Sequence, residues 1–507
     1  MNPRSAAIGL ALLLCAAAYP QAADLKSEVD DLKARVRLLE RELQELRQLL
    51  VAKAAPVPRQ PVADGGSQSQ QDAPISIRVG SAEVTPYGFF DVSATLRDKT
   101  IGCGMPTNFG AVPLRGTVEG RLGETRITAQ NSRLGFRLEA PAGGAKLAAM
   151  FEIDFLGSFQ PNTPVIGHAY GPRLRQFWAG VRTGRIEFLG GQAWSLLTPN
   201  RRGLSPYPPD VFLTQDLDPN LQVGLLWSRS PQFRVVYHAT EKAAFGVSVE
   251  AAEQYGGGVG GAGVITLPSA LAAAYANQVH SGGSAFGTPN PGPDIIAKAA
   301  FDPTLRGRAA HIEFAGLLSR FAFYNPLSGR RFHTVGGGGS LNAGFELFRN
   351  FRVYTNNFLS SGGGRWIYAQ GPNLVIQEDG SPSLVRAGST VDGVEYQPSS
   401  KWQVFAYYGG AYFGRNVVLD PSASRPVGFG YSGSPTGHNR VLHEATGGAS
   451  YTFFRNPASG AVQFITQYSY LRRSPWFAAE RTPRFAQANM LYLTFRYVLP
   501  GSPRPSF

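Results

Sequence analysis

Apolar and polar residues alternate along most of this chain with a period of two, the pattern of β-strands whose two faces meet different environments. Residues 132–155 show the pattern twice, as two strands joined by a tight turn at 141–144. The apolar face carries Leu134, Phe136, Leu138, Phe151, Ile153 and Phe155, and the charged face carries Arg133, Arg137, Glu139, Glu152 and Asp154. A soluble sandwich would bury the apolar face in a core. A membrane barrel would turn it toward lipid and line its lumen with the charges.

The same alternation predicts sixteen strands between residues 85 and 499: 85–96, 128–140, 146–156, 173–182, 185–195, 232–240, 245–253, 293–301, 308–321, 333–348, 351–360, 383–397, 401–415, 441–455, 461–473 and 486–499. The connections between them are long and short in turn. Outer-membrane barrels have this asymmetry, with short turns at one rim and long loops at the other. A further strand at 221–229 would break the order, so we assign these residues to the third long connection.

We therefore predict an all-β fold, a 16-stranded antiparallel transmembrane β-barrel over residues 75–507, preceded by an N-terminal α-helical coiled coil. Residues 1–23 have the short apolar run of a secretory signal peptide. Residues 24–53 carry leucine and valine at alternating steps of four and three, which favours a coiled coil over a single amphipathic helix. The helix number is open, since the seam fits a dimer and the barrel suggests three copies. Residues 54–74, rich in Pro, Gly, Ser and Gln, are predicted to be a flexible linker.

The net charge of +13 raises the question of a nucleic-acid partner. The chain has no run of five or more Lys or Arg residues, no zinc-finger spacing and no RNA-binding signature, so we exclude that partner. A basic lumen that attracts small anions explains the charge better. The histidines have no metal-ligand spacing, and the glycines at 336–339 lack the Lys and Ser or Thr of a phosphate loop. We predict no catalytic residue, metal or cofactor; the enzyme alternative is an outer-membrane protease or phospholipase.

Alternation also assigns side chains to the lumen, because Arg or Lys on a lipid face would cost about 2–4 kcal/mol near the bilayer centre. The candidate anion-binding residues on strands are Arg133, Arg137, Arg173, Arg175, Arg234 and Lys298, and the opposing acids are Asp91, Glu139, Glu152 and Asp154. Two interpretations stay open: a ladder of arginines that faces passing anions, and ion pairing within the cluster. Arg201 and Arg202 belong to the third long connection, which either folds inward to narrow the channel or ends in a solvated tip.

Local motifs also resemble those of a known family. They are YGFFDVSATL at 87–96, AQNSRLGFRL at 129–138, FEIDFLG at 151–157, RLRQFW at 173–178, GGQAWSLLTP at 190–199, SPQFRVVY at 230–237 and PDIIAK at 293–298. In this order, behind heptads and a polar linker, they resemble DcaP-type trimeric outer-membrane porins. Two features depart from the family: residues 500–507 follow the last strand, and the connection 254–292 is unusually rich in Gly and Ala.

The resemblance implies a homotrimer surrounded by outer-membrane lipid, with a basic constriction that passes small anions such as dicarboxylates. The coiled coil would lie in the periplasm, where it could contact peptidoglycan or a periplasmic partner. The predicted function is a porin for passive, anion-preferring diffusion of small solutes. The alternatives are a phosphate-selective porin and an adhesin or cell-wall tether without transport.

Overall fold

A computed structural model describes residues 76–101, 106–157, 171–207, 221–258, 260–281 and 288–502. It also describes the separate helical positions Ala34, Arg37, Arg41 and Gln44. The chain divides into two compact units, Met1–Gln68 and Ser69–Phe507. Apart from those four positions, the predicted signal peptide (1–23), coiled coil (24–53) and linker (54–74) lie outside the described residues.

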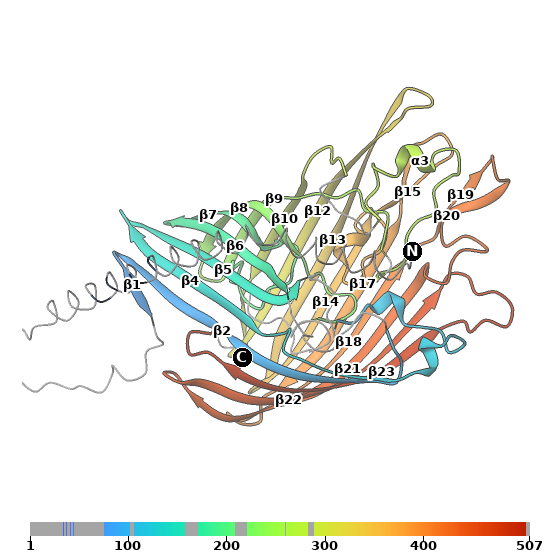
Figure 1. Ribbon diagram of the computed structural model, residues 1–507. Helices are drawn as coiled ribbons and strands as arrows, with labels where there is room; N and C mark the ends of the chain where they lie inside the picture. The colour runs from blue at the N-terminus through green and yellow to red at the C-terminus, as the bar shows by residue number, and fades with distance from the viewer. Residues whose placement is uncertain are drawn as a thin grey trace, which may run out of the picture. The chain divides into compact units, whose positions relative to one another are not determined.

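Sixteen strands of the described chain form one closed antiparallel barrel (Figure 1). They are β2 (Ala82–Arg97), β4 (Arg133–Ala142), β5 (Ala145–Gly157), β6 (Gly171–Thr183), β7 (Ile186–Trp194), β8 (Arg229–Thr240), β9 (Ala243–Glu250), β10 (Asp294–Phe301), β12 (Arg308–Asn325), β13 (Arg330–Phe348), β14 (Phe351–Ser361), β17 (Arg386–Tyr396), β18 (Trp402–Phe413), β21 (Asn439–Asn456), β22 (Gly460–Pro475) and β23 (Ala486–Val498). Each strand pairs with the next, and β23 returns to β2, where Tyr497 lies opposite Phe90. The predicted all-β barrel is confirmed.

Smaller elements surround the barrel strands. The strands are β1 (Ile77–Val79), β3 (Glu124–Thr128), β11 (Thr304–Leu305), β15 (Leu374–Ile376), β16 (Pro382–Leu384), β19 (Asn416–Asp420) and β20 (Arg425–Phe429). The helices are η1 (Phe109–Ala111), η2 (Glu119–Arg121), η4 (Gly364–Trp366) and α3 (Ala272–Tyr275). Strands β15 and β16 pair with each other, as do β19 and β20, so these two ribbons stand apart from the barrel sheet.

The connections alternate in length as predicted, with one exception. We call the rim with turns such as 143–144 and 184–185 the short-turn rim, and the opposite rim the long-loop rim. The predicted long loop at 322–332 is wrong, because β12 and β13 stay paired up to Asn325 opposite Arg330. Their hairpin forms the tall projection in Figure 1. Strand pairing satisfies the backbone there and leaves only a four-residue turn at 326–329.

The outer wall of the barrel is apolar. Phe233 on β8 is 76% exposed, whereas its neighbour Arg234 is 4% exposed, so successive residues face opposite sides. The same outward exposure recurs at Phe90, Phe136, Phe177, Val247, Phe314 and Phe464. Among the described residues, no helix is long and apolar enough to cross a lipid bilayer.

An aromatic girdle encircles part of the wall near the short-turn rim. It comprises Phe348, Phe351, Tyr396, Trp402, Tyr451 and Phe453. The rings of Phe348 and Phe351 stack at 4.4 Å between centroids, and Trp402 meets Tyr451 at 4.9 Å. Aromatic girdles of this kind mark the boundary of the apolar band in outer-membrane barrels.

The main hydrophobic core of the described chain lies inside the barrel, because the long connections fold inward. Phe109, Val223, Ile265 and Trp366 from four connections pack with inward-facing side chains of the wall. The Gly- and Ala-rich connection 254–292 contributes Ile265, and also Leu271 and Tyr275. The sequence predicts loops in this region, but it does not predict that they pack together into a hydrophobic core inside the barrel.

His438 shows how the long connections are fixed to one another. Its Nδ1 accepts a hydrogen bond from the Gly430 backbone N–H, and its Nε2 lies 2.6 Å from the carbonyl oxygen of Val264. Burial lowers the pKa of His438 below its ordinary value. The neutral ring with the proton on Nε2 satisfies both contacts.

Because the outer face of the wall is apolar, a charged side chain placed on it is expected to destabilise the barrel. Val247 is exposed in the middle of β9. In a lipid bilayer, Val247→Arg is expected to lower the free energy of unfolding by about 2–4 kcal/mol, because the guanidinium would face hydrocarbon. Urea unfolding in lipid vesicles measures this loss, with Val247→Leu as the control. Equal stabilities of the two variants would contradict an outer wall that faces lipid.

Candidate functional site: the barrel lumen

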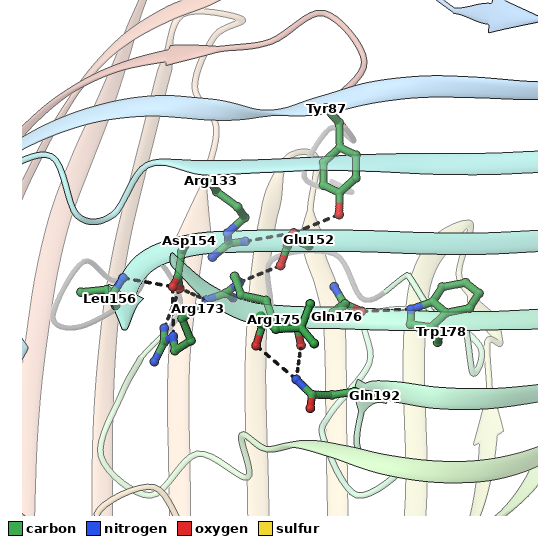
Figure 2. Close-up of polar contacts among 11 residues, drawn as sticks. Tyr87, Arg133, Glu152, Asp154, Leu156, Arg173, Arg175, Gln176, Trp178 and Gln192 are labelled. Atoms are coloured by element: carbon green, nitrogen blue, oxygen red, sulfur yellow. Dashed lines mark hydrogen bonds and ion pairs between the residues drawn. The ribbon is translucent and has the colours of Figure 1, made fainter. Parts of the chain in front are cut away.

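Arginines and carboxylates of β4, β5 and β6 meet on the inner wall (Figure 2). Arg175 donates from Nε to Glu152 at 2.6 Å and from Nη1 to Asp154 at 2.8 Å. Arg173 binds both oxygens of Asp154, at 3.0 and 2.6 Å. Tyr87 donates its hydroxyl hydrogen to Glu152 at 3.2 Å. The two carboxylates therefore hold Arg173 and Arg175 in place.

A β-bulge places Arg175 in this cluster. Glu152 lies opposite Gln176 and Ile153 lies opposite Leu174, so Arg175 is an extra residue in β6. Arg175 and Gln176 both point inward as a result, and the alternation of the strand reverses there. Gln192 donates to the carbonyl oxygens of Leu174 and Arg175, at 3.1 Å each, so the carbonyls at the bulge keep partners.

Arg133 and Arg137 lie on the same inner face but make looser contacts. Arg133 is 3.9 Å from Glu152, and its guanidinium carbon is 5.2 Å from the ring centre of Phe89. Arg137 lies 5.9 Å from the ring centre of Tyr207 and donates from Nη2 to the Gly501 carbonyl oxygen at 3.4 Å. Both arginines are partly exposed inside the barrel. They are candidates to meet a solute.

The described parts of the third long connection, 195–207 and 221–228, fold into the barrel; we call them the inner loop. It starts at the end of β7 and attaches to successive strands of the wall. The Leu196 N–H donates to Glu250 of β9 at 2.9 Å, and the Asn200 N–H donates to Glu313 of β12 at 3.2 Å. On its return, the Val223 N–H donates to Glu444 of β21 at 2.8 Å. The inner loop thus narrows the lumen.

Lys298 serves the same attachment from β10. Its Nζ donates to the Thr198 carbonyl oxygen at 2.7 Å and lies 2.8 Å from Glu313, and both charged side chains are fully buried. His311 bridges Glu313 and Asp302, with ring nitrogens 3.1 and 2.7 Å from the two carboxylates. Lys298 is therefore committed to an ion pair beneath the inner loop.

Arg201 and Arg202 have different surroundings on the inner loop. Arg201 forms a bidentate pair with Glu395 of β17, at 2.8 and 2.5 Å, and is buried. Tyr354 and Tyr407 complete this contact, at 2.7 Å from Arg201 and 2.5 Å from Glu395 respectively. Arg202 is exposed.

The remaining sequence candidates occupy three further places. Asp91 of β2 is buried in an ion pair with Arg496, at 2.5 Å. Arg234 of β8 is buried near Glu187 and Glu250, and no hydrogen-bond acceptor among the described residues contacts its Nε or Nη2. Glu139 is exposed toward the short-turn rim.

A cavity of about 1090 Å³ opens at the short-turn rim. Its charged lining consists of Arg78, Lys146, Arg182 and Arg202 with Glu83, Glu139, Glu187, Glu241 and Asp302. Tyr207 of the inner loop also lines it, and burial together with Glu139 raises the pKa of this phenol to about 12. Cationic side chains and carboxylates are nearly equal in number in this cavity, so its lining has little net charge to favour anions or cations.

The described residues hold no group of three or more His, Cys, Asp or Glu side chains that could bind a metal. Many of the ionisable groups of the lumen are joined in ion pairs and hydrogen bonds along the wall. This arrangement can shape and polarise a passage for solutes.

The outer membrane channel DcaP of Acinetobacter baumannii has a crystal structure that matches this chain with a TM-score of 0.59. The match covers 84% of this chain and 99% of that chain, at 16% sequence identity. The chain has the DcaP fold. The resemblance read from the sequence is confirmed at the level of the fold.

Two further solved structures match this chain with lower TM-scores. An anion-selective porin from Comamonas acidovorans has a TM-score of 0.45 and 12% identity, over 82% of this chain and 99% of that chain. OmpT of Vibrio cholerae has a TM-score of 0.42 and 11% identity, over 84% and 100%. No family model and no curated protein matches the sequence. The fold assignment rests on DcaP.

Alternation along the strands predicts that Glu250 and Glu313 face the lumen, but the sequence did not predict that they attach the inner loop. Nothing in the sequence couples them to residues 196 and 200. Glu395 lies 194 residues after Arg201. Only the inward periodicity of β9, β12 and β17 could have marked these carboxylates as lumenal.

The Arg175 cluster predicts a large loss of stability when its centre is removed. Arg175→Met leaves two buried carboxylates short of a partner and is expected to reduce the free energy of unfolding by about 3–5 kcal/mol. Arg173→Met should cost less, because that side chain is 31% exposed and water can replace it. Unfolding in detergent micelles compares the two. A loss no larger for Arg175→Met than for Arg173→Met would contradict the role of burial.

Proposed function

We propose that this protein is an outer-membrane porin that gives small solutes passive passage through its barrel. The observation that carries the proposal is a closed barrel with an apolar outer wall, a charged inner wall and an inner loop that narrows the lumen. Outer-membrane channels combine these three features. The DcaP fold supports the same interpretation, since that structure is described as an outer membrane channel.

The proposed preference is for anions, and it depends on the cations that solutes can reach. Arg173, Arg175, Arg201 and Lys298 are held by carboxylates. Arg133 and Arg137 have looser contacts on the inner wall. Arginine recognises carboxylates and phosphates through paired hydrogen bonds. We therefore propose small anions such as dicarboxylates as solutes, drawn past the partly exposed Arg133, Arg137 and Arg173.

The proposal extends to the setting of the pore. Three copies would form a homotrimer in the outer membrane, with the short-turn rim and the N-terminal coiled coil on the periplasmic side. The coiled coil could then bind peptidoglycan or a periplasmic partner. These statements rest on the sequence pattern and on the fold.

The alternatives differ in what the lumen transmits. A phosphate-selective porin would have its conductance blocked more strongly by phosphate than by succinate, and competition of the two anions separates the cases. A tether without transport would give no conductance in a planar bilayer. The partly exposed arginines of the inner wall favour transport of anions over a closed tether.

Charge reversal at Arg133, which is partly exposed on the inner wall, tests the proposed anion preference. Arg133→Glu is expected to shift the reversal potential in a salt gradient toward cation selectivity, because the passage would lose a cation and gain an anion. Planar-bilayer recordings of the purified protein measure the shift. Arg425→Glu on the ribbon β19–β20 makes the same charge change away from the inner wall and serves as the control. Equal reversal potentials for Arg133→Glu and the unaltered protein would overturn the assignment.

Release of the inner loop tests its role as the constriction. Glu395→Gln removes the charge partner of Arg201 and is expected to raise the single-channel conductance or its fluctuations, since the loop loses its attachment to β17. Glu480→Gln, an acid-to-amide change at an exposed residue of the connection between β22 and β23, is the matched control. Conductance traces identical to those of the unaltered protein would place the constriction elsewhere.

A further inference from the structure

Three strands of the outer wall carry an exposed arginine near their long-loop ends. They are Arg320 on β12, Arg386 on β17 and Arg472 on β22. Alternate residues of a strand share a face, and each arginine is an even number of positions from an exposed apolar or aromatic residue of its own strand. Those residues are Leu318, Tyr396 and Tyr468 respectively. The three arginines therefore point outward, and we call them the arginine belt.

The height of Arg386 on the barrel follows from the aromatic girdle near the short-turn rim. Arg386 and the girdle residue Tyr396 are the two ends of β17, ten positions apart. Ten positions span about 33 Å along a strand, and about 25 Å along the axis of a barrel whose strands tilt by about 40°. The apolar band of outer-membrane barrels is about 25 Å tall. Arg386 therefore lies at the edge of this band toward the long-loop rim.

Arg472 reaches the same height. It lies opposite His443 of β21, which is ten positions before the girdle residue Phe453. Its guanidinium carbon is 4.1 Å from the ring centre of Phe485. This cation–π contact holds the arginine at the edge of the apolar band.

Arg320 lies slightly higher, at the base of the β12–β13 hairpin, which is the tall projection in Figure 1. It is opposite Val335 of β13, thirteen positions before the girdle residue Phe348. By the same measure this is about 33 Å along the barrel axis, just beyond the apolar band.

The hairpin continues the basic surface away from the bilayer centre. Arg331 and His333 of β13 are exposed and share the outward face of Val335. The opposite face of the hairpin is covered by a long connection, whose Tyr275 stacks on Phe323 at 5.9 Å between ring centres. The hairpin thus turns an apolar face toward the protein and a basic face outward.

The arginine belt differs from the arginines of the inner wall in its partners. The side chains of Arg320, Arg386 and Arg472 form no ion pair and no hydrogen bond with another described residue. Arg175 and Arg201, by contrast, are held by carboxylates. A guanidinium at the edge of hydrocarbon needs acceptors from its surroundings. Lipid phosphates lie at this height, and arginine binds phosphate through paired hydrogen bonds.

We propose that the arginine belt binds the phosphates of lipid headgroups in the outer leaflet, an inference that rests on the proposed outer-membrane porin with its short-turn rim in the periplasm. The wall below the belt suits the rest of such a lipid. Leu318 and Phe314, 39% and 51% exposed, lie below Arg320 on β12 and can contact acyl chains. Charge, height and apolar surface together favour a phosphorylated lipid over a soluble anion.

Removal of the belt charges tests the proposal. The full chain in mild detergent is titrated with diphosphorylated lipid A, and the bound lipids are counted by native mass spectrometry. The triple variant Arg320→Gln, Arg386→Gln, Arg472→Gln is expected to bind lipid A about fivefold more weakly at each altered site, because each site loses one cation. Phosphatidylcholine has a zwitterionic headgroup and should bind the variant and the unaltered protein equally.

The matched control is Arg185→Gln, Arg306→Gln, Arg349→Gln, which removes three exposed arginines from the short-turn rim. This control should bind lipid A as the unaltered protein does. An equal loss in both triple variants, or no loss in the belt variant, would overturn the proposal. Heat-dependent migration on gels shows that each variant is folded.

The same spectra distinguish the other occupants of this surface. A belt variant that separates into monomers yet keeps its lipid A would assign the arginines to a contact between copies and overturn the proposal. Inorganic phosphate lacks acyl chains and should not displace lipid A at equal concentration. Displacement would indicate a site for soluble anions and would also contradict the proposal.

Bilayer recordings keep this inference apart from the proposed function. An unaltered protein that binds lipid A through the belt but conducts nothing would overturn the pore and leave the belt. A conducting protein whose lipid A binding does not depend on the belt would overturn the belt and leave the pore.

Discussion

The pairing of β23 with β2 is the contact on which the rest of the structure depends. It joins the last strand of the barrel to the first and leaves no free edge in the ring. A strand edge in hydrocarbon would expose unpaired N–H and C=O groups, each costing several kcal/mol. Closure also separates two environments. Successive side chains along each strand meet different environments because the closed ring encloses one face of the wall.

Enclosure concentrates charge. Polar side chains excluded from the outer wall gather inside, where Glu152, Asp154, Glu313 and Glu395 are all buried. Each carboxylate forms an ion pair: Glu152 with Arg175, Asp154 with Arg173, Glu313 with Lys298 and Glu395 with Arg201. The net positive charge of the chain therefore overstates what a solute would meet. Much of the charge in the lumen serves to hold the inner loop and the wall together.

Periodicity predicted the barrel well because lipid and lumen impose opposite demands on neighbouring residues. The strand at 293–301 was identified by Ile295, Ala297, Ala299 and Phe301, and β10 matches it almost residue for residue. The alternation of apolar and polar residues was less informative where two strands stay paired beyond the part of the barrel that has an apolar outer face. The hairpin of β12 and β13 runs on past the predicted loop at 322–332, since backbone pairing needs no apolar face. The bulge at Arg175 and the pair of Arg201 with Glu395 depend on distant residues, and no local pattern encodes them.

The attachments of the inner loop impose an order on biogenesis. Residues 196–201 bind side chains of β9, β12 and β17, and residue 223 binds β21, so their partners emerge from the ribosome up to 221 residues later. A nascent or half-assembled barrel has the loop but not the strands that hold it. The narrow passage is thus among the last features to form.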